Sequence, residues 1–233
     1  MLRQPLRLIP PNICLPILQG RLRGKRWITG SSLHGCWLGS FESDKQTVFE
    51  MIVKPGDTVY DIGANVGFYT LLASELAGPS GCVYAFEPLP RNVEFLNQHL
   101  TLNGAKNTKV LEVAVSDTNG QASFDDSPNN SMGQLSNSGK RKVKTVTIDR
   151  LLSEGTILPP GCMKIDVEGA EMLVLSGAKS VLKTYRPHIF LATHGLHVHK
   201  EACEFLKSLG YQLQAIGSKS IEETDELIAM VIS

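Results

Sequence analysis

The sequence lacks several features that mark common classes of protein. It has no excess charge, since 23 Lys and Arg balance 23 Asp and Glu, which argues against a generally basic nucleic-acid binder and an acidic disordered tail. Its apolar residues, 42% of the chain, form no run near the ~18 residues that span a bilayer. The length of 233 residues suits one domain of ordinary size with its own core.

Cysteine patterns of known meaning are also missing. The five cysteines are scattered and form no C-x-x-C pair, so neither a zinc site nor a disulfide framework is predicted. We interpret them as small core residues in a reducing compartment. Four prolines interrupt the basic N-terminal stretch up to Pro16, which lacks the unbroken apolar segment of a signal peptide. A cytoplasmic protein is therefore expected.

From residue 57 onward, short apolar runs alternate with helical patterns, which is typical of a mostly parallel sheet flanked by helices. Strands are predicted at 58–62, 82–86, 110–115, 163–167 and 189–193. Helices are predicted from Phe68, from Pro90, over 171–184 and around 202–209. The segments 211–216 and 227–232 are expected to pair as a closing antiparallel hairpin.

Two regions fall outside this alternation. Residues 1–50 form an N-terminal extension that is basic up to Glu42, the first acid. Its segment from Trp27 to Gly39, with Trp37, is expected to form short strands that cover the domain 51–233, either for stability or as a lid over the substrate. Its positive charge could also hold an anionic partner or a membrane surface.

The second region, 119–145, is expected to be a hairpin-like insertion. Its amide and hydroxyl side chains are candidates to bind a polyhydroxylated acceptor, or simply a solvated loop: Ser127, Asn129, Asn130, Ser131 and Asn137.

A glycine-rich segment follows the first predicted strand. Gly63 and Gly67, with Asn65 between them, connect Asp61 at the strand end to the next helix. Such a turn lets a ligand approach the backbone, and the helix N-terminus offers N–H groups to a carboxylate or phosphate. The sequence therefore predicts a cofactor loop at 61–70.

The acid at the end of the second strand refines this prediction. Glu87 can accept two hydrogen bonds from a ribose diol, as in dinucleotide folds. Phe68 stands where G-x-G-x-x-G would place a third glycine, so pyrophosphate is less favoured than a nucleoside with a smaller charged tail. S-adenosylmethionine meets that description, because its cationic groups suit nearby carboxylates and its carboxylate suits backbone N–H groups.

Four ordered segments resemble those of the FkbM methyltransferase family: 61–70, 86–88, 114–117 and 164–171. The resemblance covers about residues 50–195. It implies an α/β, Rossmann-like methyltransferase fold, S-adenosylmethionine as methyl donor and, usually, transfer to a hydroxyl oxygen.

Carried over to single positions, the resemblance implies a set of cofactor contacts. Glu87 would hold the ribose, and Ala114 and Val115 would flank the adenine, with Ser116 or Asp117 near its amino group. The methionine part would be surrounded by Asp61, Gly63, Asn65 and Gly67.

Methyl transfer to an alcohol needs a base near the sulfonium, and in an open α/β sheet that place is the carboxyl end of the central strands. Asp166 ends the fourth strand and His194 follows the fifth, so both are candidate catalytic residues. Alternatively, Asp166 caps the next helix, Glu168 and Glu171 favour its dipole, and His194 is structural.

Metal binding is a further alternative at these strand ends. Asp166, Glu168 and Glu171 could hold Mg²⁺, and His194, His197 and His199 lie within six residues. The sequence shows neither a second set of oxygen ligands nor a companion cysteine. No metal site is therefore predicted.

Other functions remain to be weighed against methyl transfer to oxygen. A nicotinamide-dependent oxidoreductase is disfavoured by the missing glycine and by the absence of a Tyr-x-x-x-Lys pair. Methyltransferases for base amino groups resemble one another in an Asp/Asn-Pro-Pro-aromatic turn, where this chain has Asp166-Val167-Glu168-Gly169. A macromolecular nitrogen acceptor or a non-catalytic cofactor-binding module stays open. The favoured interpretation is an O-methyltransferase for a sugar or other hydroxylated small molecule or natural product.

Overall fold

The computed structural model describes residues 9–125, 134–135 and 141–231. Its main sheet has seven strands in the order β12-β13-β11-β10-β3-β4-β5. In chain order these are β3 (Thr58–Ile62), β4 (Cys82–Phe86), β5 (Thr108–Leu111), β10 (Cys162–Ile165), β11 (His188–Ala192), β12 (Gln212–Ala215) and β13 (Glu226–Met230). The strands from β11 to β5 pair in parallel, and β13 pairs antiparallel with β11 and with β12. The predicted mostly parallel sheet with a closing hairpin is confirmed.

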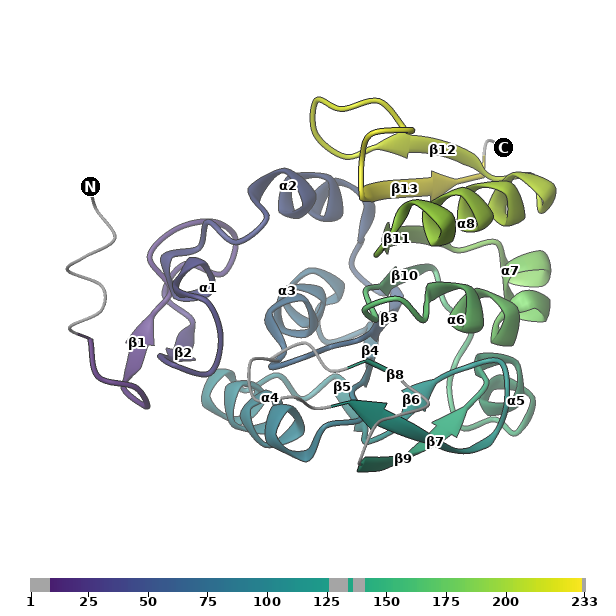
Figure 1. Ribbon diagram of the computed structural model, residues 1–233. Coiled ribbons are helices and arrows are strands. Elements are labelled where there is room, and N and C mark those ends of the chain that lie inside the picture. The colour runs from purple at the N-terminus through teal and green to yellow at the C-terminus, as the bar shows by residue number, and fades with distance from the viewer. Residues whose placement is uncertain (1–8, 126–133, 136–140, 232–233) are drawn as a thin grey trace.

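Helices cover both faces of this sheet (Figure 1). One face carries α3 (Phe68–Ala77) and α4 (Pro90–Asn103), and the other carries α6 (Glu171–Gly177), α7 (Lys179–Tyr185) and α8 (Leu196–Ser208). Alternation along β3 divides the core accordingly, since Val59 packs with α3 whereas Tyr60 and Ile62 pack with α6, α7 and α8. Burial on both faces explains why the central strands are mostly apolar, with Asp61 of β3 and Lys164 of β10 as buried exceptions.

Two predicted elements are divided in the structure. The strand predicted at 110–115 becomes β5 and a separate strand, β6 (Ala114–Val115), which pairs with another sheet. The helix predicted at 171–184 breaks between α6 and α7 at Ala178. Gly177 lies there against the backbone of Ser116, where a Cβ would come within 2.0 Å of the carbonyl oxygen. This contact between distant segments is not visible in the local pattern.

The N-terminal part packs against the same core. It contains β1 (Cys14–Pro16), β2 (Arg26–Ile28), α1 (His34–Leu38) and α2 (Ser43–Ile52), and Figure 1 shows β1, β2 and α1 beyond α3 and α4. Trp27 is buried and stacks on His99 of α4, with ring centroids 3.8 Å apart. The expectation of short strands in 27–39 is confirmed for Trp27, which lies in β2, and is wrong for Trp37, which lies in α1.

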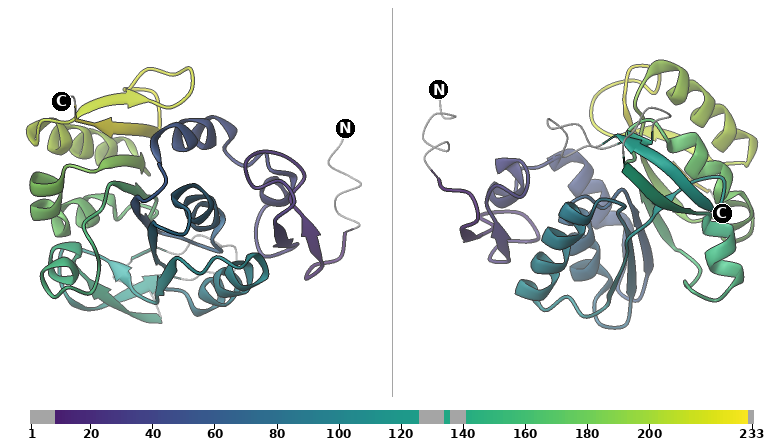
Figure 2. Two further views of the ribbon diagram at one scale, coloured as in Figure 1. Left: turned by 180° about the vertical axis from the view of Figure 1, so that it is seen from behind. Right: turned by 60° about the horizontal axis from the view of Figure 1, so that its bottom comes forward.

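A smaller sheet holds the predicted insertion. Its order is β6-β9-β7-β8, with β7 (Gly120–Asp125), β8 (Gln134–Leu135) and β9 (Arg141–Val146). Figure 2 shows it at one edge of the main sheet, next to α5 (Ile148–Ser153). The helix α5 was not predicted; Thr147 caps it by accepting a hydrogen bond from the backbone N–H of Arg150. The candidate acceptor-binding residues Ser127, Asn129, Asn130, Ser131 and Asn137 lie outside the described residues.

Among the described residues, no helix is long and apolar enough to cross a membrane. All five cysteines are free. Cys36, Cys162 and Cys203 are buried, as predicted for small core residues, whereas Cys14 is exposed.

Candidate active site

A cavity of about 320 Å³ opens at the carboxyl ends of β3, β4, β10 and β11. Its volume falls at the lower end of ligand-binding pockets, roughly 300–1,000 Å³. Because these strands are parallel, the residues that follow each of them meet at one edge of the sheet. Gly63, Glu87, Asp166 and His194 all line the cavity in this way.

The glycine loop approaches the neighbouring strand end very closely. Gly63 has a φ of 79°, and a Cβ there would lie 1.9 Å from the carbonyl oxygen of Asp166. Gly67 has a φ of 93° and begins α3. Asn65 also has a left-handed φ, 50°, which asparagine tolerates better than most residues. The loop conformation therefore depends on these residue types.

Internal acceptors already use the N–H groups of this loop. The N–H groups of Gly63 and Ala64 donate to the carbonyl oxygen of Phe86, and that of Gly67 donates to Ala64. The N–H of Asn65 donates to Glu87 at 2.8 Å, and that of Val66 to the Asn65 side chain at 2.7 Å.

Donors for a ligand carboxylate must therefore come from the first turn of α3 and not from the loop itself. The N–H groups of Phe68 and Tyr69 have no intrahelical acceptor, and both residues line the cavity.

Glu87 supports the loop as well as facing the cavity. Besides Asn65, its carboxylate accepts hydrogen bonds from the N–H of Leu89 at 2.9 Å and the side chain of Asn92 at 3.3 Å. Burial raises its pKa, although these three donors favour the ionised form. An ionised carboxylate offers about four acceptor positions, so one remains for a ligand hydroxyl. From the sequence, we expected Glu87 to accept two hydrogen bonds from the ribose.

Of the residues expected around the adenine, some line the cavity and one is buried in the protein interior. Ala114 and Val115 line the cavity, as does Val113. Ser116 is buried and its backbone N–H donates to Val146, and it does not line the cavity. Phe124 of β7 lines it instead, so the insertion reaches this site, although Phe124 itself was not a candidate residue.

Asp61 lies beneath the cavity floor and does not line it. Its carboxylate accepts a hydrogen bond from Thr70 at 2.5 Å and lies 3.3 Å from the ammonium of Lys164. That ammonium also lies 3.5 Å from Asp166 and donates to the carbonyl of Gly63 at 3.2 Å. Burial by itself would lower the pKa of Lys164, but Asp61 and Asp166 raise it overall. Lys164 therefore stays charged and joins the two acids.

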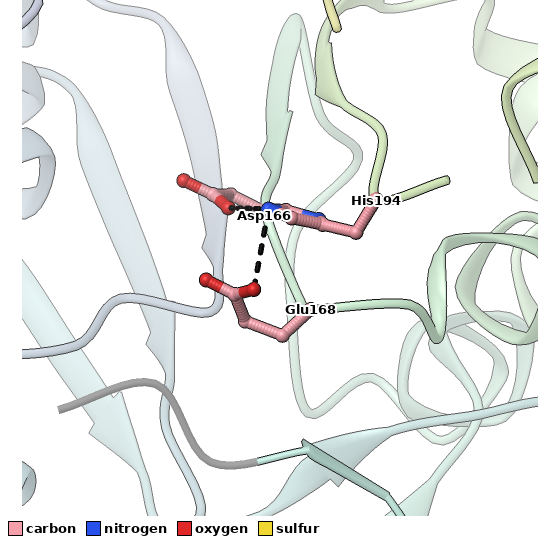
Figure 3. A group of neighbouring side chains, drawn as sticks. All are labelled: Asp166, Glu168 and His194. Atoms are coloured by element: carbon pink, nitrogen blue, oxygen red, sulfur yellow. Dashed lines mark ion pairs between the residues drawn. The ribbon is translucent and has the colours of Figure 1, made fainter. Parts of the chain in front are cut away.

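His194 lies next to three carboxyl groups, and Figure 3 shows two of them, those of Asp166 and Glu168. Its Nδ1 lies 2.7 Å from Glu171, and its Nε2 lies 3.3 Å from Glu168 and 3.8 Å from Asp166. Glu168 is held in a left-handed turn, with φ 52°, just before Gly169. The structure thus brings Asp166 and His194 together, and it adds Glu168 and Glu171 to them.

Charge interactions within this group oppose burial. The hydrogen bond to Glu171 raises the pKa of His194 to about 9, against the effect of burial and with help from Glu168 and Asp166. Burial disfavours the ionised form of Asp166, yet Lys164, Lys45 and His194 lower its pKa overall. The site therefore carries charged groups of both signs.

A second charged group at the cavity comes from segments that sequence reasoning did not connect. Lys45 of α2 is buried and pairs with Glu42 at 2.7 Å and with Glu226 of β13. Burial raises the pKa of Glu226 to about 7, although Lys45 opposes this. Glu42 was noted only as the first acid of the chain, and no local pattern connects it to β13.

The N-terminal segment also forms part of the cavity wall. Ser32, Leu33, Cys36 and Phe41 line it together with Glu42. This placement is compatible with a segment that covers the substrate.

The match to a family model covers residues 61–213 and is described as the methyltransferase FkbM domain. The chain belongs to the FkbM methyltransferase family. This confirms the resemblance inferred from the four sequence segments.

Curated relatives agree with this assignment. The hexuronic acid methyltransferase AglP of Haloferax volcanii is 32% identical over 131 residues, which cover 55% of this chain and 52% of AglP. The 31-O-demethyl-FK506 methyltransferase FkbM of Streptomyces tacrolimicus is 27% identical, with 54% of this chain and 61% of the relative covered. The matches thus span little more than half the length of these relatives.

Solved structures share the fold at low sequence identity. Methyltransferase FkbM from Methylobacillus flagellatus has a TM-score of 0.57 at 14% identity, covering 85% of this chain and 55% of that chain. An S-adenosylmethionine-dependent O-methyltransferase from Thermotoga maritima has a TM-score of 0.54 at 13% identity, covering 96% and 79%. The Rossmann-like methyltransferase fold is confirmed.

A further structure with this fold was solved with the expected cofactor bound. Fibrillarin from Aeropyrum pernix, with a TM-score of 0.50 at 13% identity and coverage of 79% and 72%, was crystallised with natively bound S-adenosylmethionine. The FkbM family is a family of S-adenosylmethionine-dependent methyltransferases, which confirms the predicted cofactor. The cavity suits this group, because Phe68 and Tyr69 at the start of α3 and the apolar Ala114 and Val115 line it, and Glu87 keeps one acceptor position.

Proposed function

We propose that the protein transfers a methyl group from S-adenosylmethionine to a hydroxyl oxygen of a sugar or another hydroxylated small molecule. The observation that carries this proposal is one cavity with two unlike ends. Glu87 follows β4 at one end, Asp166 and His194 follow β10 and β11 at the other, and Gly63 follows β3 between them. The names of AglP and of the Streptomyces FkbM support acceptors of the sugar or natural-product class.

Hydrogen-bond donors and apolar walls support the proposed position of the cofactor. The first-turn N–H groups of α3, at Phe68 and Tyr69, would hold the methionine carboxylate. Glu87 would accept one hydroxyl of the ribose, and Ala114 and Val115 would flank the adenine. Asp61 would support the cofactor end of the cavity without contacting the cofactor, because it accepts a hydrogen bond from Thr70 of α3 and pairs with Lys164.

The acceptor end must position a hydroxyl and remove its proton. As the oxygen–carbon bond forms and the carbon–sulfur bond breaks, the electron pair stays on sulfur and the hydroxyl proton passes to a base. Asp166 is the proposed base, since its carboxylate lines the cavity and Lys164 and His194 hold it from two sides. His194 orients the acceptor oxygen next to it.

The experiment is a transfer assay with isotope-labelled S-adenosylmethionine. The acceptors are hexuronic acids, their glycosides, neutral sugars and a polyhydroxylated macrolide, and mass spectrometry detects the labelled methyl. We expect a labelled O-methyl product from at least one acceptor and its reduction by at least about 100-fold in Asp166→Asn. Asp44→Asn, an exposed acid of α2, is the matched control and should keep full turnover.

Two results would overturn the proposal. One is label on a nitrogen of a macromolecule and on none of the hydroxylated acceptors. The other is tight cofactor binding without turnover on any acceptor, the behaviour of a binding module.

A further inference from the structure

Three potential ligand atoms converge at the acceptor end of the cavity (Figure 3). One oxygen of Asp166, one of Glu168 and a ring nitrogen of His194 all lie within 4.8 Å of one another. The two acids follow β10 and the histidine follows β11, so adjacent parallel strands hold them from both sides. All three residues line the cavity.

A buried carboxylate fixes the orientation of the histidine. Glu171 is fully buried, and its Oε1 accepts the N–H of Gly169 at 3.0 Å and lies 2.7 Å from Nδ1 of His194. An ionised carboxylate can only accept, so Nδ1 carries the hydrogen and Nε2 faces Asp166 and Glu168. Metal-binding histidines are oriented in this way by a carboxylate behind the ring.

Glu171 also adds a buried carboxyl group that is only partly hydrogen-bonded. Its second oxygen, Oε2, is buried and has no hydrogen-bond partner among the described residues. Around the His194 ring there are thus three carboxyl groups, and their charge is opposed by Lys164 next to Asp166 and by the proton of His194, whose pKa is raised to about 9. A divalent metal ion on Nε2 would replace this ring proton and supply the positive charge between the two facing carboxylates.

The spacing suits coordination better than direct hydrogen bonding. Ligand atoms about 2.1 Å from one ion lie about 3.0 Å apart at right angles and about 3.4 Å apart at tetrahedral angles. Nε2 lies 3.3 Å from Glu168 and 3.8 Å from Asp166, which is beyond an ordinary N–H···O distance of 2.7–3.2 Å. The two carboxylates would have to turn toward a bound ion to complete the set.

We propose that Asp166, Glu168 and His194 bind a divalent metal ion of the Mn²⁺ type. Two carboxylates and one imidazole combine the oxygen ligands that suit Mg²⁺ and Mn²⁺ with a nitrogen ligand that Mg²⁺ seldom takes. The ion would keep open positions toward the cavity. Its role toward an acceptor hydroxyl rests on the proposed function, whereas its binding does not.

The ion and the proposed base are compatible. A carboxylate that binds the ion through one oxygen retains its second oxygen for a proton. The open positions would be filled by water or by oxygens of the acceptor, so an acceptor with two neighbouring oxygens would gain most.

The test measures binding of Mn²⁺ alone to the full chain after chelator treatment, without cofactor or acceptor. Isothermal titration calorimetry and the loss of the free Mn²⁺ electron paramagnetic resonance signal give affinity and stoichiometry. We expect one saturable site per chain. Glu168→Gln and His194→Gln should weaken it at least about tenfold, and Glu171→Gln by about 10–100-fold.

His197→Gln is the matched control, because His197 pairs with Glu201 at 3.3 Å on the exposed surface of α8. It should leave the affinity unchanged. Glu168→Gln alters no buried packing and decides the test if the His194 variant fails to fold, which thermal unfolding of each variant will show. No saturable binding in the wild-type protein, or equal affinity in Glu168→Gln, would overturn the inference.

The same preparation separates this inference from the proposed function. A protein that methylates a hydroxyl in the presence of chelator and binds no Mn²⁺ would refute the metal site alone. A protein that binds Mn²⁺ through Glu168 but methylates no hydroxyl would refute the proposed acceptor class alone.

Discussion

The two ends of the cavity are formed by different kinds of chemical group. At the cofactor end, backbone groups of a short loop are satisfied internally, and Glu87 completes them with three hydrogen bonds. At the acceptor end, side chains carry the structure, and charges from β10, β11, α2 and β13 meet there.

Two histidines show the same contrast. His99 stacks on Trp27 behind the cofactor loop, and burial lowers its pKa to about 4. His194 lies among three carboxyl groups, and its hydrogen bond to Glu171 raises its pKa to about 9. The histidine at the cofactor end is thus kept neutral as part of the core, whereas the surroundings of His194 favour its protonated, cationic form.

The largest effect is expected from Gly63→Ala. The left-handed φ costs about 1–3 kcal/mol for a residue with a side chain, and the new Cβ would meet the carbonyl of Asp166 at 1.9 Å. We expect at least about 3 kcal/mol of lost stability in urea unfolding and no measurable cofactor binding by calorimetry.

Gly104→Ala is the control for this prediction, because Gly104 has a similar φ of 64° but nothing within 4 Å of its Cβ position. It should lose only about 1–2 kcal/mol and bind the cofactor normally. Equal losses in the two variants would show that the close approach to Asp166 is unimportant.

Asp166→Asn is expected to distinguish most clearly between the role of the acceptor end in turnover and the role of the cofactor end in binding. Removal of the base should reduce turnover at least about 100-fold, whereas the affinity for S-adenosylmethionine should change by less than about threefold. Steady-state kinetics and calorimetry on the same variant check both halves. A similar loss of affinity would mean that Asp166 serves the cofactor instead.

The contrast also explains what the sequence could predict. The strands at 58–62 and 82–86 were predicted with the bounds that the structure shows, because local apolar runs end at residues of the cofactor loop. The roles of Lys45 and Glu226 could not be predicted, since an ion pair between α2 and β13 leaves no local pattern. Glu171 was expected at a helix start, where α6 does begin, but its complete burial against His194 could not be predicted.

The pH dependence of stability tests the cofactor side through His99. Its Nδ1 lies 2.8 Å from the carbonyl of Val66, and its Nε2 accepts the N–H of Ile28, so the folded state holds it neutral. Its pKa falls from 6.5 to about 4 on folding, so the unfolded chain binds the proton first. Stability is therefore full above pH 6.5 and is lost as pH falls toward 4, by at most about 3 kcal/mol.

Urea unfolding of wild-type protein and His99→Asn across this pH range measures the effect. The variant should be less stable near neutrality, and the gap should narrow as pH falls. A constant gap would mean that His99 takes up its proton equally well in the folded protein.

Glu87→Gln should give the smallest effect. The amide keeps one acceptor oxygen but presents an NH₂ group to a backbone donor, so the loop support and the ribose contact are both weakened. We expect about tenfold weaker cofactor binding, or about 1.4 kcal/mol, measured by calorimetry. Glu94→Gln, an exposed acid of α4, should bind as the wild type does, and an unchanged Glu87→Gln would remove the ribose assignment.

A crystal structure with S-adenosylhomocysteine, the demethylated cofactor, would test the division of the cavity most directly. We expect the ribose next to Glu87, the adenine against Ala114 and Val115, and the sulfur directed toward Asp166 and His194. A cofactor bound in the reverse direction, with its adenine among the charged side chains at the ends of β10 and β11, would contradict the division into two ends.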